Sequence, residues 1–283
     1  MTDKQIVVLY HGKCPDGFGA AYAAWKKFGD SAEYIPVDHG DPPPKGLEER
    51  EVYLLDFSYE TQEQMDMLAR ITKRFVVLDH HESVRKFVES TPEHVYDGDR
   101  SGASISWAYF HPDAPLPRLI RHLEDGDLYR YALPGTRDIF SYLLVLPTEF
   151  EAWDAFAREL DDDAARPELL KKAAAYTEFF NALANMSAER AKKVSFEGYE
   201  VLFVATHPAQ TMRSYVGNLL YHKLPPFAIV ATAHPNGFGV SLRSDGSVDV
   251  SKIAAKYGGG GHPGSAGFFV PNNSEMPWKE IEG

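Results

Sequence analysis

Short apolar runs alternate with segments of helix length along the first 130 residues. The apolar runs at 6–10, 33–37, 52–56 and 75–79 predict four strands, and the segments 18–28, 61–72, 82–90 and 101–110 predict the helices between them. Apolar runs separated by helices are typical of a parallel sheet that is covered on both faces. The pattern therefore predicts an α/β fold for this part of the chain.

A long helical stretch follows the predicted sheet. Residues 149–194 are almost all helix formers, interrupted only at 161–167, and apolar residues recur at helical spacing over 168–192. This spacing predicts one long helix with a single apolar stripe. The sequence leaves open whether that helix is a rigid spacer or part of an interface in a homodimer.

A second α/β pattern occupies the last third of the chain. Its predicted strands are 201–205, 227–233, 237–244 and 268–270, and its predicted helices are 211–223 and 250–257. We therefore expect an α/β domain over 1–150, a helical linker over 151–195 and a smaller α/β domain over 196–283. One continuous domain with an internal helical insert is the alternative.

Composition places the chain among soluble proteins with substantial cores. Of its 283 residues, 44% are hydrophobic and 25% are charged, which is ordinary for such proteins. No apolar run approaches the roughly 18–20 residues that span a bilayer, and the N-terminal apolar run is too short for a secretory signal. Cys14 is the single cysteine, which excludes a disulfide framework and suits a cytoplasmic protein.

The net charge of -12 limits the partners that the chain can bind. Nearly all of this charge lies in the first 195 residues, since 196–283 contribute only -1. A surface of this sign does not track long duplex DNA. It is compatible with a small phosphorylated substrate if metal ions offset the local negative charge.

Polar residues follow three of the predicted strands. His11 follows the first, and Asp56 and the Asp79-His80-His81 triplet end the two others. Ligands bind beyond the carboxyl ends of strands in open α/β sheets, so these side chains are expected to converge. Together with Asp16 and Asp125, the residues His11, Asp56 and His80 supply the mixture of carboxylate and imidazole that hard divalent cations prefer. Two such ions would activate water and clamp a phosphate.

Each of these residues also has a purely structural interpretation. Asp16 is a possible helix cap, and Asp56 and Asp125 each suit an ordinary turn. A cysteine phosphatase loop needs an arginine five residues after the cysteine, but residue 19 is glycine. The motifs of the phosphate loop, the nucleophile elbow and the HExxH zinc helix are absent too. A nucleophilic pair of Cys14 and His11 lacks a visible third group to orient it.

The C-terminal third carries a glycine run, GGGGHPGSAG, over 258–267. Consecutive glycines let the backbone approach a ligand and expose N–H groups to an anion, and His262 adds a donor. Arg243 ends the predicted strand 237–244, where its guanidinium could hold a phosphate bidentately. A flexible loop and a solvated arginine are the alternatives.

In these motifs the sequence resembles the DHH phosphoesterase superfamily, which is named for the triplet at 79–81. Residues 11–17, 56, 79–81 and 125 match its four motifs in order, and Arg243-Ser244 with the glycine run matches its associated C-terminal domain. The resemblance implies two divalent ions, usually Mn²⁺, in a cleft between the two domains. It implies metal ligation by His11, Asp16, Asp56, His80 and Asp125, with Asp56 bridging; catalysis by Asp79, His81 and Arg243; and substrate binding by Arg243, Ser244, Gly259, Gly260, Gly261 and His262.

One position departs from the family pattern. The first motif commonly reads D-x-D, whereas Cys14 stands at the first of these positions and Asp16 at the second. A thiolate suits Zn²⁺ or Fe²⁺ better than Mn²⁺ or Mg²⁺. Cys14 is therefore either a metal ligand itself or the mark of a weakened site.

The resemblance implies a metal-dependent phosphohydrolase. We expect short oligonucleotides or 3′-phosphonucleotides as substrates, because the acidic chain disfavours long strands. Hydrolysis of polyphosphate or cyclic dinucleotides is an alternative with the same metals. A nucleotide-binding relative without activity, in which Cys14 marks a lost metal site, is the second alternative.

Overall fold

A computed structural model describes residues 4–12 and 14–281, so Lys13 of the first motif lies outside the described residues. The chain forms two compact units, the first extending to Thr177 and the second beginning at Glu178. The longest described helix, α8 (Arg166–Glu189), contributes to both units. None of the helices in the described ranges combines the length and apolar character needed to cross a bilayer.

A five-stranded parallel sheet forms the centre of the first unit. Its strands are β1 (Ile6–His11), β2 (Ala32–Val37), β3 (Glu51–Leu55), β4 (Arg74–Asp79) and β5 (Glu93–Tyr96), in the order β2-β1-β3-β4-β5. The four predicted strands and their parallel arrangement are confirmed. The short edge strand β5 was not predicted, because its half-exposed sequence carries no apolar run.

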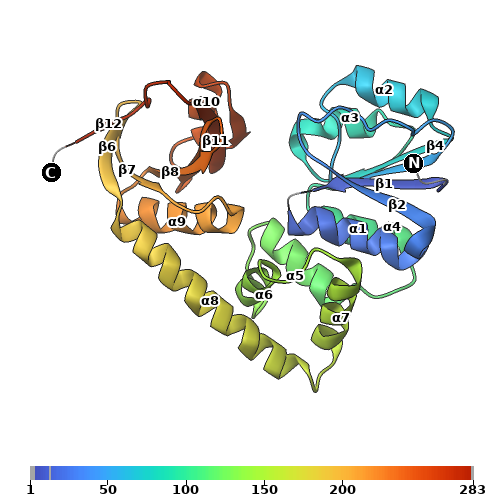
Figure 1. Ribbon diagram of the computed structural model, residues 1–283. Coiled ribbons are helices and arrows are strands. Elements are labelled where there is room, and N and C mark those ends of the chain that lie inside the picture. The colour runs from blue at the N-terminus through green and yellow to red at the C-terminus, as the bar shows by residue number, and fades with distance from the viewer. Residues whose placement is uncertain (1–3, 13, 282–283) are drawn as a thin grey trace. The chain divides into compact units, whose positions relative to one another are not determined.

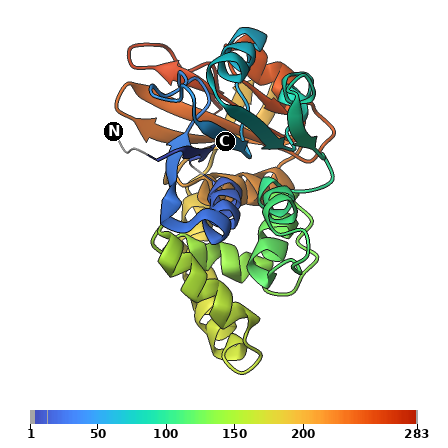
Figure 2. The same ribbon diagram turned by 90° about the vertical axis from the view of Figure 1, so that its right-hand side faces the viewer.

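Helices cover both faces of this sheet (Figures 1 and 2). They are α1 (Pro15–Phe28), α2 (Gln62–Ile71), α3 (Arg85–Glu89) and α4 (Gly102–Phe110), with short 3₁₀ turns at Gly29–Ser31 and Glu82–Val84. Alternate residues of β1 enter separate cores: Val8 and Tyr10 pack on the side of α1 and α4, and Val7 and Leu9 pack on the side of α2 and α3. Burial on both faces explains why the strands read as continuous apolar runs.

Further helices extend the first unit beyond the sheet. They are α5 (Arg118–Asp127), α6 (Thr136–Leu143), α7 (Phe150–Asp161) and the first part of α8. The sequence pattern did not predict α5 and α6. Leu123 of α5, Trp153 of α7 and Leu169 of α8 join the core on the α1 side, so the compact unit continues well past residue 150.

The second unit contains a seven-stranded sheet in which β7 and β8 pair in parallel, whereas the other strand pairs of the described residues are antiparallel. Its strands are β6 (Lys192–Phe196), β7 (Tyr199–Ala205), β8 (Phe227–His234), β9 (Gly237–Ser244), β10 (Gly260–His262), β11 (Ser265–Pro271) and β12 (Lys279–Glu280), in the order β10-β11-β9-β8-β7-β6-β12. Helix α9 (Gln210–Lys223) and the end of α8 share one core, and α10 (Val250–Lys256) packs into another. The predicted second α/β segment is therefore present.

Candidate metal centre

The polar residues at the strand ends of the first sheet converge. His11 ends β1, Asp56 follows β3 directly, and His80 follows β4. These strands are neighbours and run in parallel, so their carboxyl ends meet at one edge of the sheet. This edge carries three overlapping groups of potential metal ligands among the described residues.

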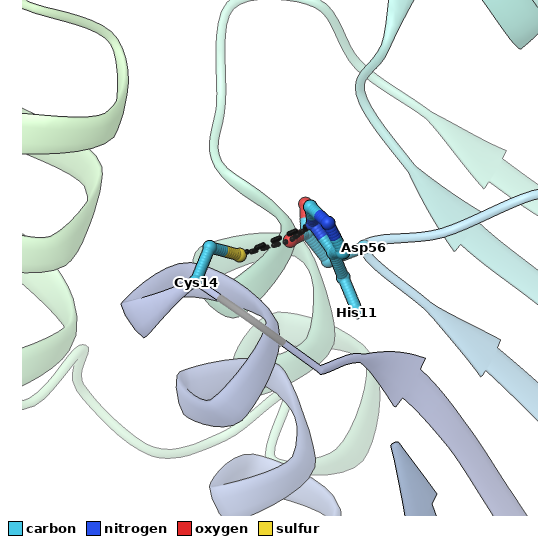
Figure 3. A group of neighbouring side chains, drawn as sticks. All are labelled: His11, Cys14 and Asp56. Atoms are coloured by element: carbon cyan, nitrogen blue, oxygen red, sulfur yellow. Dashed lines mark hydrogen bonds and ion pairs between the residues drawn. The ribbon is translucent and has the colours of Figure 1, made fainter. Parts of the chain in front are cut away.

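The first group consists of His11, Cys14 and Asp56 (Figure 3). Cys14 Sγ lies 3.2 Å from His11 Nδ1 and 3.3 Å from Asp56 Oδ2. His11 Nδ1 lies 3.5 Å from the same carboxylate oxygen. A thiol, an imidazole and a carboxylate oxygen therefore surround one small volume.

The two other groups meet at His80. Its Nε2 lies 3.2 Å from Asp56 Oδ1 and 3.5 Å from Asp127 Oδ2. Asp56, His80 and His81 form the second group, and Asp16, His80 and Asp127 form the third. The predicted ligands His11, Asp16, Asp56 and His80 thus lie together, and Asp127 joins them.

Asp56 occupies the middle of this arrangement. Its Oδ2 faces His11 and Cys14, whereas its Oδ1 faces His80, which is the disposition required of a carboxylate that bridges two ions. The backbone of Asp56 has a positive φ of 54°, a conformation that costs free energy for a residue with a side chain. A Cβ added to Gly102 would lie 2.5 Å from the Asp56 Oδ1 atom, so glycine at 102 makes room for the carboxylate.

Local sequence places Cys14 and His11 in contact. Cys14 caps helix α1, because its Sγ accepts a hydrogen bond from the Gly17 N–H at 3.1 Å. A Cβ on Gly17 would come within 2.1 Å of the His11 carbonyl oxygen. The glycine of the first motif therefore lets the start of α1 pack directly against the end of β1.

The chemistry of the donor set fits divalent cations. Asp56 Oδ1 and His80 Nε2 are both buried, and the contact of 3.2 Å between them falls short of hydrogen-bond geometry, although buried polar atoms are nearly always satisfied. Carboxylate and imidazole donors suit Mn²⁺ and Mg²⁺, and the Cys14 thiol adds affinity for Zn²⁺ or Fe²⁺. A bound cation would satisfy both atoms.

The electrostatics of the group also favour a cation. Burial raises the pKa of Asp16 well above its usual value, and the neighbouring charges of Asp56 and Asp127 raise it further. Burial and the charge of Asp56 raise the pKa of Asp127 to about 6. For Asp56 itself, burial acts in the same direction, but the imidazoles of His11 and His80 outweigh it and lower the pKa. The site therefore concentrates negative charge that a metal ion would neutralise.

Asp79 holds His81 in place. The Asp79 Oδ1 atom accepts hydrogen bonds from the backbone N–H of His80 at 2.7 Å and from the N–H of His81 at 3.0 Å, and lies 2.7 Å from His81 Nδ1. Burial alone would lower the pKa of His81, but the contact with Asp79 and the charge of Asp56 raise it to about 9. His81 is therefore protonated at neutral pH and is oriented by the fully buried Asp79.

Asp125 does not join the ligand groups, contrary to expectation. Its carboxylate accepts hydrogen bonds from Ala132 N at 2.8 Å, Leu133 N at 3.0 Å and the Thr136 hydroxyl at 2.5 Å. These donors occupy both oxygens and fix the chain after α5. Asp127, two residues later at the end of α5, faces His80 instead. The acidic pair in the sequence was the only signal for Asp127.

The predicted substrate-binding residues all lie in the second unit. The Ser244 hydroxyl donates to Val248 O at 2.7 Å and accepts from Gly246 N, so it stabilises the turn after β9. Close backbone contacts require glycine at 259 and 261. A Cβ on Gly259 would come within 2.1 Å of Gly267 O, and a Cβ on Gly261 would come within 2.6 Å of Ser265 O. A Cβ on Gly260 would meet no atom within 4 Å.

Gly260 and the exposed His262 belong to the edge strand β10. Their surface is therefore open to a ligand. Arg243, at the other side of β11, is half-buried, and its Nη2 donates to the Ser214 hydroxyl at 3.0 Å. Gly260 and His262 are therefore exposed, whereas Arg243 is anchored to Ser214 and Ser244 has a structural task.

Comparison with known proteins identifies the second unit. Residues 198–280 match the model of the DHHA1 domain. The chain is 30% identical to uncharacterized protein R106 of Acanthamoeba polyphaga mimivirus over 304 aligned residues. The alignment covers 99% of this chain and 71% of that protein.

Solved structures share the fold of both units at low sequence identity. RecJ of Thermus thermophilus in complex with Mn²⁺ aligns with a TM-score of 0.54 and 13% identity over 94% of this chain and 49% of RecJ. The pGpG-specific phosphodiesterase PggH of Vibrio cholerae aligns with a TM-score of 0.51 and 13% identity over 95% of this chain and 94% of PggH. The chain therefore contains a DHHA1 domain and belongs to the same family as the mimivirus protein R106.

Proposed function

We propose that this chain is a metal-dependent phosphoesterase that hydrolyses small phosphorylated substrates. The observation that carries the proposal is the Asp56 carboxylate, whose two oxygens face two separate sets of donor atoms. Divalent ions bound there would supply a hydroxide nucleophile at neutral pH and would neutralise charge on the phosphate. RecJ, which shares the fold, binds Mn²⁺.

The residues around the ions have separate tasks in this proposal. His11, Asp16, Asp56, His80 and Asp127 would hold the cations. Asp79 orients His81 through its Nδ1. In its protonated form, the remaining ring N–H of His81 would donate to the phosphate or to the leaving oxygen. A positioned proton donor of this kind contributes about 10²–10⁴-fold to a rate.

Short oligonucleotides and 3′-phosphonucleotides are the substrates that we propose. PggH acts on the dinucleotide pGpG, and the net charge of -12 disfavours long strands. In the second unit, Arg243 and His262 would bind substrate oxygens, and Gly260 would let the backbone approach them. A reduced Cys14 agrees with the cytoplasmic location expected from the sequence.

Metal content and hydrolysis test this proposal together. The protein is stripped with a chelator, reloaded separately with Mn²⁺, Mg²⁺, Zn²⁺ or Fe²⁺, and assayed on dinucleotides, pAp, cyclic dinucleotides and polyphosphate. We expect about two ions per chain, preference for the first two substrates, and loss of turnover in His80→Ala but not in the exposed control His222→Ala. Absence of both bound metal and turnover with every cation would leave a binding protein on an enzyme fold.

Cys14→Asp is expected to shift the metal preference from Zn²⁺ towards Mn²⁺ by at least about tenfold, because a hard oxygen replaces sulfur. Aspartate is also a good helix cap, so α1 is expected to remain intact. Burial and the charges of Asp56 and Asp16 raise the pKa of the Cys14 thiol well above its usual value, so a metal must displace its proton.

Competition between the two metals, followed by elemental analysis, measures this preference. Cys14→Ser, which keeps a capping hydroxyl without the thiolate, serves as the control. Equal metal preference in the wild type and both variants would show that Cys14 is not a ligand.

A further inference from the structure

A cavity of about 510 Å³ lies on the α1 side of the first unit. Helices α1, α4, α5 and α7 meet around it (Figure 1), together with the loop that precedes α5. Its lining includes Tyr22 and Lys26 of α1, Trp107 of α4, and Ala157 and Arg158 of α7. The volume is in the range of sites that hold a small organic ligand.

This cavity is separate from the metal centre. Asp16 lies at the start of α1, whereas Tyr22 and Lys26 follow it six and ten residues later. At the rise of an α-helix, these two positions lie about 9 and 15 Å along the axis from Asp16. Among the described residues, none of the potential metal ligands lines the cavity. A molecule bound there would therefore occupy a second site.

The floor of the cavity is apolar and contains one unsatisfied donor. Tyr22, Trp107 and Ala157 are each more than nine-tenths buried. The indole Nε1 of Trp107 is shielded from solvent and makes no hydrogen bond within the described part of the chain, although buried polar atoms nearly always have a partner. The Tyr22 hydroxyl is already engaged, since it donates to Asp154 at 2.9 Å. Trp107 therefore supplies a donor that an acceptor on a bound molecule would satisfy.

Basic side chains outnumber acidic ones around the cavity, although the net charge of the chain is -12. The four basic residues are Lys26, Arg118, Arg121 and Arg158, and the two acidic residues are Asp154 and Asp161. Both carboxylates are engaged. Lys26 Nζ and Arg158 Nη2 lie 2.8 and 3.2 Å from the Asp154 carboxylate, and the backbone N–H of Arg118 donates to Asp161 at 3.1 Å.

Arg121 differs from the other basic residues of the cavity. Its Nε donates to the Leu116 carbonyl oxygen at 3.0 Å, which holds the guanidinium at the exposed rim. Arg118 lies within ion-pair distance of Asp161 and Asp163, whereas none of the described carboxylates pairs with Arg121. Its guanidinium is therefore the group of the cavity that lacks a negative partner.

This combination suits a small aromatic carboxylate. A guanidinium binds a carboxylate through parallel N–H donors, and one unpaired arginine matches one negative charge. Pro115, Leu116 and Pro117 supply apolar surface, against which a flat ring buries area with little loss of conformational freedom. A cationic ligand would be repelled by the excess of basic side chains.

We propose that this cavity is a second ligand site, which binds a small aromatic carboxylate. The negative charge lies on Arg121, the ring lies against the apolar wall, and an acceptor atom of the ligand takes the hydrogen bond of the Trp107 indole. The proposal goes beyond the phosphoesterase function and does not depend on it.

The indole N–H resonances of isotope-labelled protein test the site directly. The chain is first stripped of metal and desalted, so that the probe does not bind to ions. Its four tryptophans give one indole resonance each, and Trp107→Phe identifies the one from Trp107. Titration with naphthoate should shift this resonance to saturation. Naphthamide, a neutral analogue of the same shape, should bind about tenfold more weakly.

Calorimetry measures the contribution of Arg121. Arg121→Met should raise the Kd for naphthoate about tenfold, as expected for one charge-assisted contact, and should leave the Kd for naphthamide unchanged. Arg121→Lys should retain part of the affinity, because it keeps the charge without the planar fork. The matched control is Arg70→Met, at an exposed arginine of α2 on the other face of the sheet, and it should bind naphthoate as the wild type does.

Three results would overturn the proposal. They are a Trp107 resonance that does not move, equal affinity for naphthoate in the wild type and Arg121→Met, and tighter binding of naphthyl phosphate than of naphthoate. If Trp107→Phe fails to fold, the calorimetric comparison of Arg121→Met with Arg70→Met still decides between the outcomes. Because every measurement uses metal-free protein, failure of this proposal would leave the phosphoesterase proposal intact.

Discussion

Asp56→Asn should lower kcat for phosphoester hydrolysis by roughly three orders of magnitude, or about 4 kcal/mol of transition-state stabilisation. The substitution keeps the size of the side chain and removes the charge that faces both sets of donors. Because Oδ2 lies among His11 and Cys14 and Oδ1 faces His80, both ions should bind more weakly. Elemental analysis of the purified variant should find less than one ion per chain.

The matched control is Asp113→Asn, which alters an exposed aspartate of the same unit. It should keep the metal content and kcat of the wild type. Circular dichroism of the metal-free proteins should show the same fold for all three. Full metal content together with wild-type turnover in Asp56→Asn would contradict the bridging role.

Asp125→Ala should destabilise the first unit by about 1–3 kcal/mol, because it leaves three donors without their acceptor, and one of them, the Thr136 hydroxyl, is buried. The donors are the N–H groups of Ala132 and Leu133 and the hydroxyl of Thr136. Burial acts against ionisation, but these donors outweigh it and lower the pKa of Asp125. Its contribution to stability is therefore present above the unfolded-state pKa of about 3.9 and is lost as the pH falls through the folded-state value.

Urea unfolding of metal-free protein at neutral pH measures this loss, and the difference from the wild type should disappear in strong acid.

Asp127→Asn should weaken metal binding without destabilising the fold. It removes a carboxylate whose pKa is raised to about 6, so the metal-free protein should be as stable as the wild type or more stable, while metal affinity should fall about 10–100-fold. If Asp125→Ala instead keeps its stability and loses metal, Asp125 rather than Asp127 is the ligand.

The sequence predicted the first sheet well because its strands are buried on both faces. Continuous apolar runs such as the one ending at Asp79 need no tertiary information to be read as strands. The convergence of His11, Asp56 and His80 followed from the parallel arrangement alone. Edge strands such as Glu93–Tyr96 and Lys279–Glu280 carry few buried residues. Their sequences therefore show no regular pattern of apolar residues that would predict a strand.

The remaining parts of the site depend on contacts that a linear pattern does not contain. Asp125 and Asp127 are the same residue type two positions apart, and the backbone over 132–136 holds Asp125 while Asp127 faces His80.

All residues of the metal-binding groups lie between His11 and Asp127, in the first half of the chain. During synthesis on the ribosome, the complete ligand set therefore emerges before any strand of the second unit has been translated. The core around it closes later, when Trp153 and Leu169 pack against the side chains on the α1 face of the sheet. Because domains generally fold in the order of their synthesis, we expect a nascent chain that does not yet possess the DHHA1 domain to present the metal-binding groups already.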